Sequence, residues 1–211
     1  MKKYIKWLTL CIVVFIISIF LHECGHGIAN AISGIPCSTG FNRVGDIYKY
    51  PSNPSFREAY SQADSALLDF GVPCTLVLAI VGTIMYCRGK RKKLKYVGVT
   101  IAATNSVLRL IPCLMVVLVP LFTGNIHKED ELETGLLLVQ MTNYSYWTYI
   151  PALFSIIVSV LCIIFLLKKA KKDDIGNLIP YVLLVIVAFY VGMIIVNILD
   201  NIVRINWIAL G

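Results

Sequence analysis

Charged side chains are scarce in this chain of 211 residues, because only 15% of them are Asp, Glu, Lys or Arg while 58% are hydrophobic. The mean hydropathy of +0.78 is too high for a soluble domain of this length and indicates a chain that folds in a lipid bilayer. We therefore exclude an ordinary soluble domain and expect residues 1–211 to form a single membrane domain.

Acidic residues are outnumbered by basic ones, 12 against 19, which gives a formal net charge of +7. An excess of this size can indicate a nucleic-acid partner. Here, however, the basic residues gather in short runs beside apolar stretches, where Lys and Arg act as membrane-topology signals. The predicted partner is the lipid bilayer, and nucleic-acid binding is not expected.

No CxxC pair occurs among the seven cysteines, which argues against a cysteine zinc site and against a disulfide framework. Six of them lie in or beside apolar runs and are expected to be small core residues: Cys11, Cys24, Cys74, Cys87, Cys113 and Cys162. The N-terminal segment also lacks a small-residue cleavage site after its apolar run, so we predict a retained helix rather than a signal peptide.

Five stretches have the length and apolar composition to cross a bilayer, which requires about 20 residues. They cover residues 7–33, 66–87, 96–122, 147–167 and 178 to about 200. Residues 34–64 form a polar loop outside the membrane, expected to be partly ordered over the site. Residues 123–146 contain only a short apolar run and predict a loop with an interfacial or re-entrant element. The predicted fold is an all-α integral membrane protein with about five transmembrane helices.

Basic runs set the expected orientation of these spans. Lys and Arg near span ends stay on the cytoplasmic side, which places the N-terminus, residues 88–95 and residues 168–172 there. Five spans satisfy all three assignments. The end of the first span then shares the outer side with residues 34–64 and 123–146.

The end of the first span carries the HExxH sequence from His22 to His26, which includes two of the three histidines of the chain. Histidines four residues apart lie on one helical face and can hold one Zn²⁺, while Glu23 acts on the attacking water. A pair of core histidines is the plain alternative. Polar residues inside a membrane span are costly and usually functional, which favours the metal site.

The segment from His22 to Asn30 resembles the first helix of the site-2 protease-like class of intramembrane zinc metalloproteases, and Gly34 is similar to the Gly that follows it there. Gly71-Val72-Pro73 is similar to the Gly-Pro element of that class, and residues 105–112 weakly resemble its Asn and Pro motif. The Asp-Gly motif that supplies the third ligand in the class is absent. The predicted site also faces the outer side, whereas the best-known members work near the cytoplasmic face.

A catalytic zinc site needs a third protein ligand besides His22 and His26. We favour Asp130 for its ligand type and its expected side of the membrane, and the order of Asp130-Glu131 after the third span resembles some small bacterial relatives. A solvated acidic loop is the structural alternative for Asp130. The other candidates are Asp200, His127, Glu129 and Glu131, with Asp64 and Asp69 less favoured. For Asp200, helix capping or pairing with Arg204 is the structural alternative.

Arg109 lies about 13 residues into the third span, a depth at which a guanidinium requires an anionic partner. We assign it a catalytic role, either by pairing with a ligand carboxylate or by stabilising an oxyanion. A structural salt bridge to Asp69 or Asp200 is the alternative.

The predicted function is hydrolysis of a membrane or secreted peptide by a Zn²⁺-dependent endopeptidase of a bacterial plasma membrane, with its site toward the extracytoplasmic side. The substrate would be a peptide or a membrane protein. The alternative is a non-enzymatic membrane binding or immunity protein with a metal site derived from HExxH. Retention of Glu23 argues against it, because a purely structural metal site does not need that carboxylate. A metal transporter is disfavoured, since only one ligand cluster lies at membrane depth.

Overall fold

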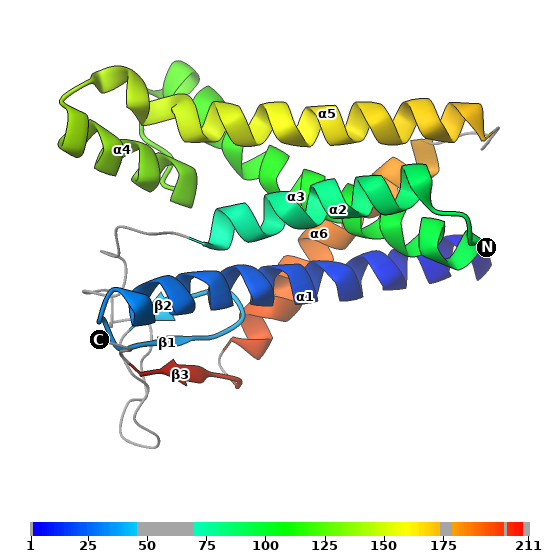
Figure 1. The fold of residues 1–211 in the computed structure, drawn as a ribbon, viewed down its shortest axis with the longest axis horizontal. Coiled ribbons are helices and arrows are strands. Elements are labelled where there is room, and N and C mark those ends of the chain that lie inside the picture. The colour runs from blue at the N-terminus through cyan, green and yellow to red at the C-terminus, as the bar shows by residue number, and fades with distance from the viewer. Residues whose placement is uncertain (1, 46–69, 174–178, 201, 209–211) are drawn as a thin grey trace. The chain divides into compact units, whose positions relative to one another are not determined.

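The computed structural model describes residues 2–45, 70–173, 179–200 and 202–208 (Figure 1). The described helices are α1 (Lys2–Ile32), α2 (Gly71–Arg88), α3 (Lys92–Thr123), α4 (Asp130–Thr142), α5 (Ile150–Lys172) and α6 (Ile179–Leu199). A 3-10 helix, Ser145–Tyr149, leads into α5. Three short strands are β1 (Cys37–Thr39), β2 (Val44–Gly45) and β3 (Ile205–Trp207).

Five of these helices, α1, α2, α3, α5 and α6, are long and apolar enough to cross a membrane. Their outward side chains agree with a lipid environment. On α5, Phe154, Ile157 and Phe165 leave 59%, 57% and 55% of their surfaces exposed, which a soluble monomer would rarely tolerate in one patch. The prediction of a largely helical fold is confirmed, with five helices long and apolar enough to cross a membrane among the described residues.

Helix α4 occupies the stretch predicted as a loop with a short embedded element. It has 13 residues, too few to span a bilayer. Its first turn contains Asp130, Glu131 and Glu133, whose charges favour the positive end of the helix dipole. The placement of α4 at the membrane interface remains a prediction.

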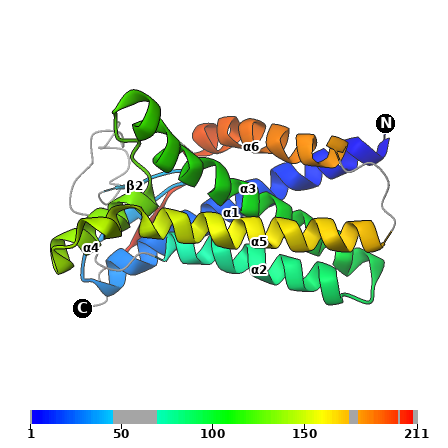
Figure 2. The same cartoon turned by 90° about the horizontal axis from the view of Figure 1, so that it is seen from above.

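The chain divides into two compact units. The first contains residues 1–15 and 75–189 and has an apolar core. Trp7 and Cys11 of α1 pack there with Val185 and Ala188 of α6, against side chains of α3. Helix α3 also packs against α5, and α4 lies beside the start of α5 (Figure 2).

Helices α2 and α3 approach closely within this first unit. A Cβ atom added to Gly82 would lie 2.6 Å from the backbone nitrogen of Ala102, and one added to Gly98 would lie 2.7 Å from that of Tyr86. Only a residue without a side chain allows this approach, as in other packed membrane helices.

The second unit contains residues 16–74 and 190–211, and it holds a small antiparallel sheet. The strand order is β2-β1-β3, so the C-terminal strand pairs with the strand that follows α1. Gly34, at a φ of 75°, ends α1 and turns the chain toward β1. The all-α prediction missed this sheet, because its strands contain only two or three residues each and carry no periodic pattern.

Candidate metal centre

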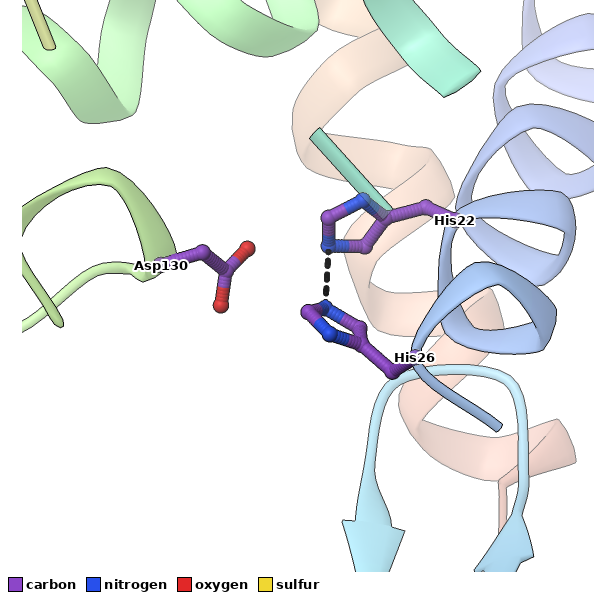
Figure 3. A group of neighbouring side chains, drawn as sticks. All are labelled: His22, His26 and Asp130. Carbon is purple, nitrogen blue, oxygen red and sulfur yellow. Dashed lines mark hydrogen bonds between the residues drawn. The ribbon is translucent and has the colours of Figure 1, made fainter. Parts of the chain in front are cut away.

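His22 and His26 lie on the same face of α1, as the four-residue spacing requires. Their Nε2 atoms are 3.2 Å apart, and the two rings meet edge to face (Figure 3). His22 is buried, with 4% of its surface exposed, while His26 is half-buried. The two imidazoles therefore present one nitrogen each to a common point.

This spacing fits two ligands of one ion. Zinc binds imidazole nitrogen at about 2.0–2.1 Å, so two ligands of a tetrahedral site lie roughly 3.3 Å apart. The 3.2 Å separation between the Nε2 atoms is close to this distance between two ligand atoms. The same distance also permits a hydrogen bond between neutral rings, with one ring donating and the other accepting.

The start of α2 comes close to both rings. A Cβ atom added to Gly71 would lie 2.7 Å from Nδ1 of His22 and 2.7 Å from Nε2 of His26. One added to Gly25 would lie 2.7 Å from the backbone nitrogen of Gly71. Gly25 and Gly71 thus let the two segments approach until backbone faces the imidazoles, which gives the Gly-Val-Pro element a steric role beside the histidines.

Glu23 is buried next to this pair, with 7% of its surface exposed. The last turns of the helix are also fixed by a side chain, since Nδ2 of Asn30 donates to the carbonyl oxygen of His26 at 3.0 Å. A carboxylate at this depth is costly unless it has a functional or ionic role.

The sheet packs on α1 just after the second histidine. A Cβ atom added to Gly27 would clash with the indole ring of Trp207, and the indole nitrogen of Trp207 donates to Oγ1 of Thr39 at 2.9 Å. Burial raises the pKa of the Cys37 thiol in β1 to about 11, so this cysteine stays protonated and acts as a core residue. Sequence reasoning missed Trp207, which it left in an unassigned tail.

Asp200 is fully buried at the end of α6, where it is engaged by the loop that follows β1. It forms an ion pair with Arg43 and accepts a hydrogen bond from the backbone nitrogen of Asn42 at 3.0 Å. The suggested pairing partner, Arg204, is replaced by Arg43. With its oxygens used in this way, Asp200 is better suited to fixing the loop than to binding a metal.

Arg109 finds its anionic partners in α4. Its Nη1 atom lies 3.4 Å from Oε1 of Glu131 and 3.6 Å from Oδ2 of Asp130. Cys113 also donates to the same Glu131 oxygen, at 3.1 Å. The alternative pairing with Asp200 is wrong for this reason, and residue 69 lies outside the described residues, as does residue 64.

Asp130 and Glu131 differ in accessibility. The Glu131 side chain has no exposed surface, whereas 32% of the Asp130 side chain is exposed. Glu131 therefore joins α4 to α3, and Asp130 keeps an accessible carboxylate beside the same cation. Asp130 belongs to the first unit and the histidines to the second, so its role as third ligand stays a prediction.

The remaining candidates, His127 and Glu129, contact each other through Nε2 and Oε1 at 3.1 Å. Burial raises the pKa of Glu129, with a further contribution from the charge of Asp130, while His127 opposes the change. This local pair gives both side chains a partner without a metal.

No family model matches the chain, and no match was found among curated proteins or solved structures.

Proposed function

We propose that this chain is a membrane-embedded zinc metallopeptidase, a distant relative of the site-2 protease-like class. His22, His26 and Asp130 would be the zinc ligands, Glu23 the general base and Arg109 an electrostatic partner of the ligand set. Figure 3 labels the three residues of the proposed ligand set. The substrate would be a membrane or secreted peptide.

The observation that carries this proposal is the convergence of the two histidines of HExxH. Their Nε2 atoms are 3.2 Å apart on a helix long and apolar enough to cross a membrane. Two imidazoles and a carboxylate in such a helix are costly, and a metal-dependent reaction explains their presence best. The buried Glu23 between them is the residue that a structural metal site would not need.

The choice of Asp130 as third ligand rests on its chemistry and accessibility. A carboxylate is a normal third ligand in a zinc site that already has two histidine ligands. Among the described acidic candidates, Glu131 and Asp200 are fully buried in ion pairs with arginine, and Glu129 contacts His127. Arg109, 3.6 Å from Asp130, would orient this carboxylate and offset its charge.

The bound metal and Glu23 would have separate roles in peptide hydrolysis. A bound zinc ion would supply Lewis acidity and lower the pKa of water toward neutrality. Glu23 would accept a proton from the attacking water and pass it to the amine leaving group. The helix fixes Glu23 one residue after His22, so the base and the two histidine ligands belong to one rigid segment of α1.

Replacement of Glu23 by Gln tests the proposal, because it keeps size and helix geometry but removes the proton acceptor. We expect zinc binding to persist and cleavage to fall by roughly 100-fold to 10,000-fold. The measurement pairs zinc content with mass spectrometry of new termini in a defined library of apolar peptides in detergent. Glu133→Gln, an exposed substitution of the same kind in α4, is the matched control.

Two outcomes would contradict the proposal. Cleavage at the wild-type rate by Glu23→Gln would show that Glu23 is not the general base. A wild-type protein that binds zinc, cleaves no peptide and has a cellular phenotype that survives Glu23→Gln would replace hydrolysis with the binding or immunity function.

A further inference from the structure

A groove lies where α2 turns into α3, entirely within the first unit. It has a volume of about 760 Å³. Its apolar wall is formed by Ile84 and Met85 of α2 with Leu94 and Val97 of α3. These residues lie between the close approach at Gly82 and Gly98 and the turn that joins the helices. The groove therefore sits at the ends of two helices suited to crossing a membrane.

The rim of the groove is basic. Four of its lining residues carry a positive charge: Arg88, Lys90, Arg91 and Lys93. All four are exposed. Within the described parts of the chain, no carboxylate lies within ion-pair distance of any of them, whereas the neighbouring Lys95 pairs with Asp173 at 3.2 Å. The rim thus concentrates positive charge that the described residues leave uncompensated.

We propose that this groove is a binding site for an anionic phospholipid. Its basic rim would hold the headgroup phosphate, and its apolar wall would contact the upper part of the acyl chains. The basic rim and the apolar wall follow one another along the helices in the same order as the headgroup and the acyl chains of a lipid at the end of a spanning helix. Basic pockets between membrane helices bind anionic headgroups in this way. A soluble phosphate compound would use the rim but gain nothing from Ile84, Leu94 or Val97.

The charge requirement is tested with two double variants of the full-length protein. Lys90→Gln with Lys93→Gln removes two charges from the rim. Lys171→Gln with Lys172→Gln removes the same charge from a basic run that does not line the groove. In neutral detergent, binding of fluorescent phosphatidylglycerol should weaken about thirtyfold in the rim variant, which corresponds to about 1 kcal/mol per charge. The control should stay near wild type.

The shape requirement is tested without changing any charge. Leu94→Trp fills the groove, and Leu167→Trp adds the same bulk on α5 at a residue of similar exposure, 43% against 41%. Only Leu94→Trp should reduce binding of phosphatidylglycerol, and phosphatidylcholine should bind weakly throughout. These tryptophan variants keep the test valid if loss of the rim charges alters folding or topology.

Three results would overturn the proposal. Equal losses of phosphatidylglycerol binding in the rim and control variants would show that the lipid is attracted by the overall positive charge and not by this groove. Unchanged binding of phosphatidylglycerol by Leu94→Trp would show that the lipid does not bind in the groove. Competition by millimolar glycerol phosphate as effective as that by unlabelled phosphatidylglycerol would make the site a phosphate site rather than a lipid site.

Discussion

Gly71 shows how one missing side chain determines what lies beside the two histidines. The backbone of this residue reaches the imidazoles so closely that an added Cβ atom would be 2.7 Å from a ring nitrogen of each. Contacts this short do not occur for real Cβ atoms, so the rings or the helix would have to move. The absence of a side chain on this glycine therefore leaves the space in which the two imidazoles lie.

Gly71→Ala should for this reason weaken zinc binding by about tenfold to a hundredfold, the range seen when residues that orient metal ligands are changed. The measurement is a competition titration with a zinc chelator. Gly82→Ala is the matched control, because a Cβ there would also clash, at 2.6 Å, but with the backbone of Ala102. If both variants bind zinc as tightly as wild type, Gly71 has no part in placing the ligands.

At the scale of elements, α4 is joined to α3 by one buried charge pair. Glu131 of α4 has no exposed side-chain surface, and it meets both Arg109 and Cys113 of α3. Without Glu131, the buried Arg109 would keep only the partly exposed Asp130, at 3.6 Å, of its two carboxylate partners in α4. Loss of the buried partner of such a pair costs about 3–5 kcal/mol.

Glu131→Ala should therefore lower the free energy of unfolding by about 3 kcal/mol or more. Glu133→Ala, in the same first turn but exposed, should change it by about 0.5 kcal/mol or less. Thermal or denaturant unfolding in detergent compares the two. Equal stability of both variants would mean that the charge pair does not hold α4 in place.

The helices could be predicted from sequence because their signal is long and uniform. Long apolar runs predicted all five of these helices, with bounds within about five residues of those in the structure. The HExxH spacing likewise placed His22 and His26 on one face, since helical periodicity is fixed. The prediction that a guanidinium at the depth of Arg109 has an anionic partner is confirmed by its ion pair with Glu131.

The sheet and the ion pairs could not be predicted in the same way. Trp207 and Thr39 meet across 168 positions in the chain, and Asp200 meets Arg43 across 157. Contacts of this separation depend on how the loop after α1 folds, which no local pattern specifies. Asp200 is a candidate zinc ligand from sequence because a carboxylate at the end of a span is costly without a cation. Its actual cation, Arg43, is too far away in the chain for a local pattern to identify it.

At the scale of the whole molecule, five crossings by α1, α2, α3, α5 and α6 would place the residues before α1 and those after α6 on opposite sides of the membrane. The basic runs predict a cytoplasmic N-terminus, so residues near Glu129 should be outside and those near Lys92 and Lys171 inside. Alkaline phosphatase fusions should be active at 129 and inactive at 92 and 171. The reverse pattern would invert the orientation and restore the cytoplasmic site typical of the site-2 protease-like class.

The zinc content of the purified protein tests the central claim most directly. We expect about one zinc per wild-type chain, because HExxH with one carboxylate forms a single site. His22→Ala and His26→Ala should each lose it. His127→Ala should retain it, since that histidine contacts Glu129 instead. Zinc retained equally by all three variants, or absent from wild type purified without chelators, would contradict a metal centre on α1.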